Sequence, residues 1–391
     1  MNQKRNQALA HNNTVLSQIL KLVDRHEFQK LANQHHQGRQ LRKMTRWTQF
    51  TAMSLAQLSG RSSLRDVVAN VTAQAHKLYH LGISQVSRTS LGRVNESQPY
   101  ELYEALFQKL LSRCQGVAPR HGFRFRNKLY SLDATTIDLC LSVFPWAKFR
   151  TTKGAVKLHV GVNHEGYLPE FISITDGKCH DITAARALRL PRGSIVAMDR
   201  GYTDYSWYNA LNSGGISFVT RQRKNASYRI INRSKVTQSK GITSDQKIQL
   251  TGVKAKICTV PLRRIGYRDP ETGKHYVFLT NNFQLAANTI AEIYKSRWQI
   301  ELFFKWIKQN LKIKSFLGTS RNAVMTQIWI AMCIYLILAW LKFSSQLNAS
   351  LQQILRLLHL NLFERRELMA LLRGDPPEPR VSPNQLILRF S

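Results

Sequence analysis

The stretch Ser194-Ile-Val-Ala-Met198-Asp199-Arg-Gly-Tyr202 places an acidic residue directly after an apolar run. Short apolar runs that end in a turn are typical of buried strands. Leu129-Tyr-Ser-Leu132-Asp133 repeats this arrangement earlier in the chain. A buried carboxylate is unfavourable by several kcal/mol unless it is paired or holds a cation, so each acid needs a reason to end a strand. Each could cap a tight turn, but two such caps at once are the less economical interpretation.

The segments around these two strands predict an α/β fold. Thr136 to Leu141 is expected to be the hairpin partner of the first strand, and residues 156–162 and 171–175 are expected to be further strands. Helices then alternate with strands, with helices expected at residues 182–188 and 205–211 and strands at residues 194–199 and 216–220. We expect Asp181 to cap the first of these helices. Paired strands followed by alternation indicate an α/β sheet.

The regions before and after this α/β segment have other predicted secondary structure. Residues 221–282 are strand-like throughout, with strands expected at residues 228–231, 248–250, 254–262 and 275–279. Residues before 120 read as helices. A helix from Ser63, the turn His80-Leu-Gly82-Ile and a basic helix from Ser87 outline a helix-turn-helix, in which Arg88 and Arg93 would contact DNA. Any small helical bundle contains such turns, so this motif is a weak signal.

A third acid lies on a helix that follows the strand-like region. At about 100° per residue, the side chains of Tyr294, Arg297, Glu301 and Lys308 share a stripe roughly 60° wide. An apolar stripe beside it would pin the helix to a core; it consists of Ile293, Ile300, Phe304, Ile307 and Leu311. An ordinary ion pair on a solvated helix would look the same in isolation.

The three acids together suggest a metal site. Asp133, Asp199 and Glu301 offer only carboxylate oxygens, which are the ligands that Mg²⁺ prefers. Two such ions about 4 Å apart can activate a water or a 3′-hydroxyl and stabilise the leaving oxygen in phosphodiester displacement. The sequence therefore predicts metal-dependent chemistry on a phosphodiester.

The composition points to a polyanionic partner. The 391 residues include 57 Lys and Arg but only 23 Asp and Glu, a net charge of +34 spread over the whole length. A membrane is the competing polyanion, but the longest apolar run, Ile328 to Trp340, is short for a bilayer. Five cysteines without CxxC spacing fit reduced thiols, and no apolar segment of a secretory signal follows Met1–Arg5. We expect a cytoplasmic, nucleoid-associated protein without a membrane role.

The acids and the helix carry a resemblance to a known family. The order of Asp133, Asp199 and Glu301 resembles the DDE transposases, with intervals of 199 − 133 = 66 and 301 − 199 = 102 residues. The spacing of Tyr294, Arg297, Glu301 and Lys308 matches the tyrosine–arginine–glutamate–lysine (YREK) signature of one large group of bacterial insertion-sequence transposases. The resemblance spans nearly the whole chain and is least informative in its last forty or so residues.

The resemblance implies an RNase-H-like catalytic core, interrupted by an all-β insertion and preceded by an α-helical DNA-binding domain. The domains implied are a helical DNA-binding domain (1–120), the first part of the core (123–220), the β insertion (221–284), the second part of the core (285–345) and a helical C-terminal region (346–391). The three acids would hold two Mg²⁺ ions, for which Mn²⁺ could substitute. The reaction would be cut-and-paste transposition through nicking, hairpin formation and resolution, and strand transfer.

The resemblance also implies how DNA is held. Tyr294 and Arg297 would grip a phosphate beside a flipped nucleotide, and Lys308 would hold a neighbouring phosphate. Trp298 could stack on the displaced base, although it could equally be a partly buried core residue. Lys305 lies within reach of the same stripe. The partners would be terminal inverted repeats and target DNA, bound by a homodimer in a synaptic complex.

Two other interpretations use the same residues. A catalytically silent DNA-binding relative would share the basic surface but would be free to lose an acid. An RNase-H-like structure-selective nuclease would need the acids but not the Tyr294, Arg297 and Lys308 stripe.

Overall fold

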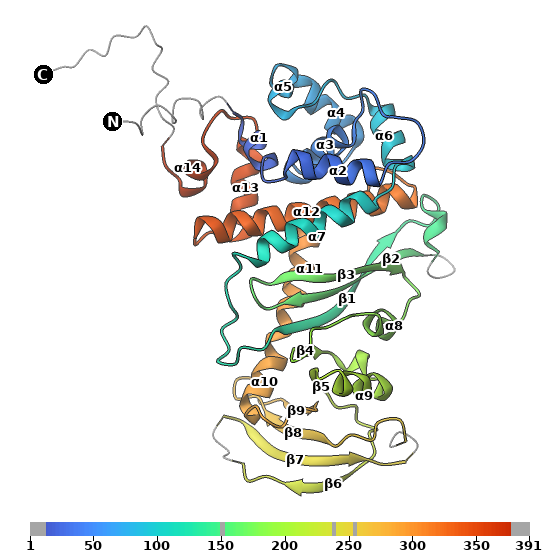
Figure 1. Ribbon diagram of the computed structural model, residues 1–391. Helices are drawn as coiled ribbons and strands as arrows, with labels where there is room; N and C mark the ends of the chain where they lie inside the picture. Colours follow the sequence, from blue (N-terminus) through green and yellow to red (C-terminus); the bar gives the residue numbers. More distant parts are fainter. Residues whose placement is uncertain (1–12, 149–152, 237–239, 253–255, 377–391) are drawn as a thin grey trace, which may run out of the picture. The chain divides into compact units, whose positions relative to one another are not determined.

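A computed structural model describes residues 13–148, 153–236, 240–252 and 256–376. In these ranges the chain is a mixed α/β structure divided into two compact units (Figure 1). The helical unit comprises Met1–Leu110, Asn310–Gly318 and Asn322–Ser391, and the sheet unit comprises Leu111–Gln309 and Thr319–Arg321. Met1–Arg5 and the end of the proline-rich segment, residues 377–379, lie outside the described residues.

The helical unit begins with short helices that polar side chains cap. Its elements are α1 (Val15–Leu20), α2 (Arg25–Gln34), α3 (Arg46–Leu58), α4 (Leu64–Ala73), the 3₁₀ turn η2 (Ala75–Lys77), α5 (Leu78–Leu81), α6 (Arg88–Ser97), most of α7 (Glu101–Gln115) and α12 (Arg321–Ser345), α13 (Leu351–Asn361) and α14 (Leu368–Arg373). Thr14, Asp24, Thr45, Ser63 and Ser87 each accept a backbone N–H three residues ahead. These bonds satisfy donors that the first turn of a helix leaves unpaired.

The apolar run that could have been a membrane span is a core helix. α12 is long and apolar enough to cross a membrane, but 94% of its most apolar window is buried. Trp329 packs against Phe107 of α7 with ring centroids 5.4 Å apart. A helix that is apolar on all sides must be surrounded by other elements. Apart from Arg321, α12 belongs to the helical unit, whereas our prediction gave residues 285–345 to the catalytic core.

In the proposed helix-turn-helix region, the helix predicted from Ser63 ends at Ala73 as α4, and the turn η2 and the short helix α5, which includes His80 and Leu81 of the predicted turn, lie between α4 and α6. α5 ends at Gly82, whose φ of 64° is left-handed and favours glycine. α6 follows with Ser87 as its N-cap. Arg88 and Arg93 are both exposed on α6. The described structure thus leaves both side chains accessible to a partner.

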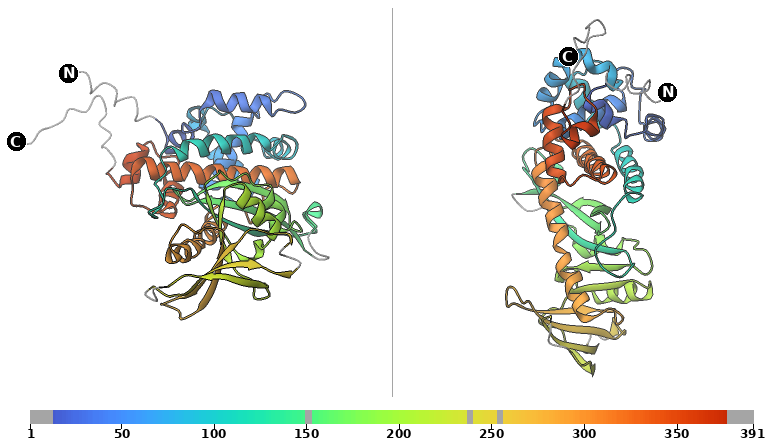
Figure 2. Two further views of the ribbon diagram at one scale, coloured as in Figure 1. Left: turned by 60° about the horizontal axis from the view of Figure 1, so that its bottom comes forward. Right: turned by 90° about the vertical axis from the view of Figure 1, so that its left-hand side faces the viewer.

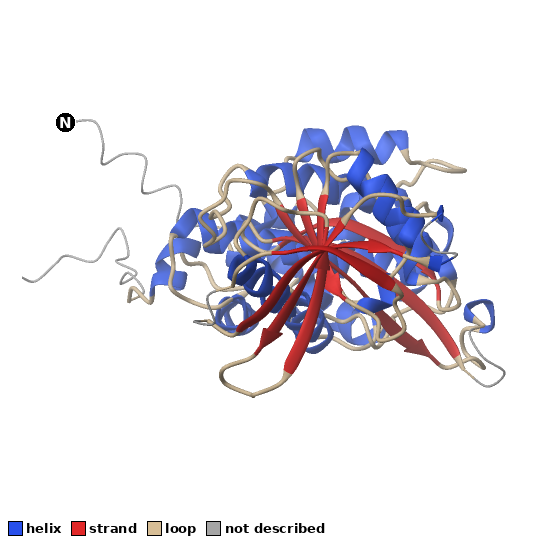
Figure 3. Ribbon diagram, turned by 90° about the horizontal axis from the view of Figure 1, so that it is seen from below, coloured by secondary structure: helices blue, strands red, loops and turns tan. Residues whose placement is uncertain are grey.

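The sheet unit is built on one nine-stranded sheet in the order β3-β2-β1-β4-β5-β9-β8-β7-β6. Its strands are β1 (Leu129–Leu139), β2 (Gly154–Asn163), β3 (Leu168–Asp176), β4 (Ile195–Met198), β5 (Ser217–Arg221), β6 (Tyr228–Arg233), β7 (Ile242–Leu250), β8 (Leu262–Arg268) and β9 (His275–Thr280). β1, β4 and β5 are parallel, and the remaining pairs are antiparallel. Seen from below, the strands fan out with the twist expected of a large sheet (Figure 3).

Helices cover both faces of this sheet. α8 (Asp181–Arg186) and α9 (Tyr205–Ser213) pack with Leu132 and Met198 on one face. α10 (Ala287–Ser296) packs with Ile195 and Ala197 on the other. α11 (Trp298–Asn310) continues from α10 nearly end to end (Figure 2). The 3₁₀ turns η3 (Pro145–Ala147) and η4 (Arg200–Tyr202) complete the unit.

Two strand predictions differ from the structure. The hairpin expected after Asp133 is absent, because β1 runs unbroken to Leu139 and pairs throughout with β2. Ala134-Thr-Thr-Ile137 contains no turn-forming glycine, proline or asparagine, and its threonines and isoleucine favour strands. The strand expected at residues 254–262 differs too: residues 254 and 255 lie outside the described residues, and the strand of this region is β8, which begins only at Leu262. Arg263 is buried there, with Nε and Nη2 donating to the Asp245 carboxylate at 2.9 and 2.6 Å.

Candidate active site

The register of two parallel strands brings two acids to the same edge of the sheet. The last pair between β1 and β4 is Leu132 with Met198. The next residue on each strand is therefore an aspartate, Asp133 and Asp199. β4 ends at Met198 while β1 continues, so both carboxylates lie where the sheet loses a neighbouring strand. Parallel strands leave an open crevice at such a point, where ligands commonly bind.

Asp133 is half-buried and lies near two other acids. Its Oδ1 accepts the N–H of Ala134 at 2.8 Å. Burial, which is the largest cause, and the charges of Asp199 and Glu301 together raise the pKa of the Asp133 carboxyl to about 6, while the Ala134 N–H and Arg297 oppose the shift. Asp199 and Glu301 are thus close enough to Asp133 to affect the pKa of its carboxyl.

Asp199 is a turn cap as well as a member of this cluster. Its Oδ1 accepts the Gly201 N–H and caps η4. A Cβ on Gly201 would lie only 2.7 Å from Asp199 Oδ1, so the carboxylate occupies the space that any other residue would fill. The turn role and the site role are therefore compatible, because the cap uses one oxygen. Among the described residues, none makes a hydrogen bond or ion pair with Asp199 Oδ2.

Arg297 joins the first acid to the third. Its Nη1 lies 3.3 Å from Asp133 Oδ2, and its Nη2 donates to Glu301 Oε1 at 2.7 Å. The predicted single helix is two helices that meet at Arg297, the C-cap of α10. There the bonds from Arg297 N to Tyr294 O and from Ile300 N to Arg297 O span three residues rather than four, which tightens the backbone. The side chains of Arg297 and Glu301 still meet, as the helical spacing predicted.

The other predicted side chains along the two helices have different surroundings. The Arg297 guanidinium carbon lies 5.7 Å from the Tyr294 ring centroid, and burial is the main cause that raises the pKa of Tyr294. Trp298 is 57% exposed, so it is not a core tryptophan. Lys305 is exposed. Lys308 Nζ donates to Thr135 Oγ1 at 2.5 Å and to Thr136 O at 3.0 Å, which ties α11 to β1.

The acids suit a hard divalent cation by their chemistry. All their donors are carboxylate oxygens, and the single guanidinium of Arg297 pairs with two of the three acids. In the described part of the chain no group of three His, Cys, Asp or Glu side chains is already arranged to hold a metal ion. The Arg297 guanidinium stands between Asp133 and Glu301. The residues therefore fit a metal, provided that this guanidinium moves.

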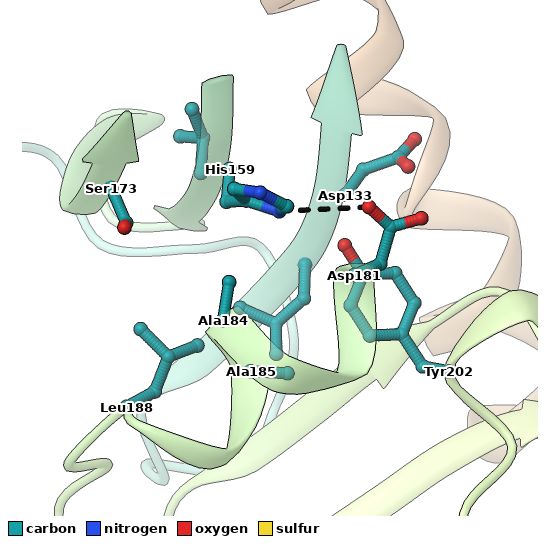
Figure 4. Close-up of a pocket in the computed structure, with 10 residues that line it drawn as sticks. Asp133, His159, Ser173, Asp181, Ala184, Ala185, Leu188 and Tyr202 are labelled. Atoms are coloured by element: carbon teal, nitrogen blue, oxygen red, sulfur yellow. Dashed lines mark ion pairs between the residues drawn. The ribbon is translucent and has the colours of Figure 1, made fainter. Parts of the chain in front are cut away.

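A second polar cluster on the other side of β1 escaped the sequence analysis. Asp133, His159, Asp181 and Tyr202 line one small pocket (Figure 4). Asp181 is the first residue of α8 and not its cap, which is His180. Its Oδ1 lies 2.6 Å from Lys157 Nζ and 3.6 Å from His159 Nδ1. Lys157 and His159 alternate on β2, and this spacing on one strand face was the available signal.

His159 is buried and has one close polar neighbour on each side of its ring. Its Nε2 lies 2.9 Å from Thr175 Oγ1. Its Nδ1 is buried, lies 3.6 Å from Asp181 Oδ1 and has no hydrogen-bond partner among the described residues. Burial lowers the pKa of His159, with Lys157 acting in the same direction and Asp181 against it. The imidazole therefore contributes no charge to Asp181 at neutral pH.

Comparisons with known proteins identify the family of this chain. The family described as "Transposase DDE domain" matches residues 125–337, which include all three acids and more than half of the chain. A "Domain of unknown function (DUF4372)" matches residues 11–84. "Putative transposase y4zB" of Sinorhizobium fredii is 33% identical over 77% of this chain and 85% of its own length.

Two further proteins are more distantly similar to this chain. "Probable transposase for insertion sequence element IS5377" of Geobacillus stearothermophilus is 30% identical over 70% of this chain and 72% of its own length. A solved synaptic complex of the piggyBac transposase with hairpin DNA covers 95% of this chain and 82% of that chain at 8% identity, with a TM-score of 0.44, too low to bear on fold or function. The family match and the identity to the two transposases show that the chain belongs to the DDE-domain transposases, enzymes that act on DNA by hydrolysis and transesterification.

Proposed function

We propose that Asp133, Asp199 and Glu301 are the catalytic acids of this DNA transposase and that they bind two Mg²⁺ ions, with Mn²⁺ able to substitute. The observation that carries the proposal is the convergence of the three acids. Strand register brings Asp133 and Asp199 to adjacent positions, and Arg297 links Asp133 to Glu301. Three neighbouring carboxylates with one cation between them have a net negative charge that a bound metal would compensate.

We propose further that the sheet unit is an RNase-H-like core. The order β3-β2-β1-β4-β5, in which β2 alone is antiparallel to both its neighbours and β4 and β5 are parallel to β1, supports this assignment. Residues 221–284 would be the insertion, and their strands β6 to β9 extend the same sheet beyond β5. The domain boundaries given above remain predictions.

The chemistry would divide between the bound metal and this chain's residues. A divalent ion at the acids would lower the pKa of an attacking water or 3′-hydroxyl and neutralise the leaving oxygen. Asp133 and Asp199 fix their part of the site on the rigid sheet, and Glu301 adds its carboxylate from α11. Lys308 fastens α11 to β1 two residues beyond Asp133, which keeps the third acid in register with the first.

DNA would be held beside the acids by the cationic and aromatic side chains of α10 and α11. We propose that Arg297 and Tyr294 bind a phosphate and that exposed Trp298 stacks on a base. Exposed Lys305 would contribute charge, as would Arg88 and Arg93 on α6. Lys308 as a phosphate ligand remains a prediction, because its ammonium contacts β1 in this structure.

The assembly and the route are also proposals. The spacing of Tyr294, Arg297, Glu301 and Lys308 favours the YREK group, whose members move an element by cut and paste. We propose that a cytoplasmic, nucleoid-associated homodimer pairs two inverted repeats in a synaptic complex. Nicking would be followed by hairpin formation, hairpin opening and joining to target DNA.

The test is cleavage of DNA that carries the inverted repeats flanking the gene, in Mg²⁺, by wild type and Glu301→Gln. Glutamine keeps the size of the side chain but loses its charge, so we expect cleavage to fall on the order of a thousandfold. Glu292→Gln removes an exposed carboxylate from the preceding helix and is the matched control, which should cleave like wild type. Hairpin-ended products from wild type and the control alone would support the proposal.

Two other cleavage results would change the proposed function. Equal cleavage by wild type and Glu301→Gln would remove Glu301 from the catalytic acids. Plain double-strand cuts that depend on Glu301 would keep the acids but exclude the hairpin route.

A further inference from the structure

Arg297 is held by the two carboxylates that the proposed function assigns to metal binding. Its Nη1 and Nη2 contact Asp133 Oδ2 and Glu301 Oε1 at 3.3 and 2.7 Å, and its side chain is only 13% exposed. An arginine that reaches two acids with its two terminal nitrogens bridges them as a divalent cation would. The inference below rests on the proposed function of these acids.

The guanidinium and a metal ion compete for the same oxygens. A metal bound by Asp133 and Glu301 needs oxygens that face the centre of the site, and those are the atoms that Arg297 now contacts. Two cations at one pair of carboxylates would also repel each other in a partly desolvated site. The binding of a metal ion and the contacts of the Arg297 guanidinium with these two carboxylates therefore weaken each other.

The present position of Arg297 leaves one of its donors unused. Its Nε is buried and has no hydrogen-bond partner among the described residues. A buried donor without a partner is unfavourable, so this arrangement does not satisfy all that the side chain can offer. A phosphate, with several acceptor oxygens, could satisfy the fork more fully once the acids are otherwise neutralised.

We propose that Arg297 is a positioning residue that acts as the counter-cation of Asp133 and Glu301 until a divalent metal displaces it and releases the guanidinium toward a DNA phosphate. In the free protein it holds the two acids together across the gap between β1 and α11. Because the displacement frees a phosphate ligand, metal binding strengthens DNA binding, and by linkage DNA binding strengthens metal binding to the same extent.

The test is calorimetric titration of the full-length protein, free of DNA, with Mn²⁺. We expect Arg297→Gln to bind Mn²⁺ about tenfold more tightly than wild type, within the usual range of coupling between sites. Lys305→Gln is the matched control, because it removes an exposed positive charge one turn from Glu301 without touching either acid. Its affinity should change much less, since exposed charges are screened.

The reciprocal effect gives a second measurement. Saturating Mn²⁺ should tighten binding of an inverted-repeat duplex by wild type, and this gain should shrink in Arg297→Gln. Arg297→Lys keeps the charge but loses the fork, so we expect it to bind Mn²⁺ between wild type and Arg297→Gln. This variant also carries the test if Arg297→Gln does not fold, and an affinity equal to wild type in Arg297→Lys would then overturn the inference.

The remaining outcomes separate the inference from the proposed function. Asp133→Asn should abolish the Mn²⁺ site. If it does, while Arg297→Gln gains no more affinity than Lys305→Gln or binds Mn²⁺ more weakly, the counter-cation role is wrong and the metal site stands. If Mn²⁺ binding is absent or independent of Asp133, the metal site itself is wrong, and the inference fails with it.

Discussion

Asp133 on β1 and Asp181 at the start of α8 each have a basic partner, but the net charge of their surroundings differs. Each contacts a long basic side chain, Arg297 at 3.3 Å for Asp133 and Lys157 at 2.6 Å for Asp181. Asp133, however, shares its arginine with Glu301 and also lies near Asp199. Asp181 has its lysine to itself, and Figure 4 shows it facing the neutral His159.

This difference in net charge indicates which of the two carboxylates can bind a further cation. A one-to-one pair such as Lys157 and Asp181 is already neutral, and Lys157 Nζ also donates to Cys179 O at 3.2 Å, which holds the chain before α8 against the sheet. Three acids around one arginine remain negative. A partly buried negative excess is stabilised by a bound cation or a bound proton. Burial is the main cause that raises the pKa of Asp133, and the charges of Asp199 and Glu301 act in the same direction. We therefore interpret Asp181 as structural and Asp133 as functional.

The largest expected effect in this comparison comes from moving one acid without changing its charge. In Gly201→Ala the new Cβ would lie 2.7 Å from Asp199 Oδ1, so the carboxylate must shift. Because the φ of Gly201 is not left-handed, alanine suits the backbone and the fold should persist. We expect cleavage to fall by about a hundredfold, as small misplacements of catalytic groups do. Measured cleavage rates at saturating Mg²⁺ would check this.

Gly122→Ala is the control, since a Cβ there meets nothing within 4 Å. Its cleavage rate and thermal unfolding should match wild type. Wild-type cleavage by Gly201→Ala, with its fold intact, would mean that the Asp199 cap is unrelated to catalysis.

The sequence predicted which side chains lie close together better than it predicted their surroundings. Apolar residues before Asp133 and Asp199 revealed two buried strands, and helical spacing placed Arg297 beside Glu301. The break between α10 and α11 was not predictable, because Arg297 favours helices and no proline or glycine marks the site. The contact of Lys308 with Thr135 depends on how α11 lies along β1, which no local pattern encodes.

Tertiary context also decided the larger differences. Asp181 follows His180 and precedes an apolar helix, so a cap was the expected role, yet Lys157 from β2 draws its carboxylate toward the sheet. The pattern of α12 predicted a buried helix correctly, whereas its place in the helical unit depends on the helices that pack around it. Such assignments depend on contacts between residues far apart in the sequence.

The effect of intermediate size is expected from His164, a buried neutral histidine beside β1, on the pH dependence of the unfolding free energy. His164 is 3% exposed, bonds Ser131 Oγ through Nε2 at 2.7 Å, and burial lowers its pKa to about 4. Unfolded histidine titrates near 6.5, so between these values the unfolded chain binds the extra proton and folding weakens as the pH falls. We expect a loss of about 2 kcal/mol from this group between pH 7 and pH 5.

Urea unfolding of wild type and His164→Gln at several pH values would measure this contribution. The variant should lose less stability than wild type over the same interval, whatever its stability at pH 7. Parallel curves for the two proteins would show that His164 does not couple folding to pH.

The smallest effect is expected where the charge is already balanced. Lys157→Met leaves Asp181 without its cation, and because the two side chains are 19% and 33% exposed, we expect a loss of only about 1 kcal/mol in unfolding free energy. Cleavage should stay within about threefold of wild type, since Asp181 contributes charge to no reacting atom. Lys178→Met, an exposed neighbour, is the control for removing a positive charge. If Lys157→Met instead folds normally and loses cleavage as severely as Glu301→Gln, the two carboxylates beside β1 work as one site, and the distinction between a balanced and an unbalanced acid fails.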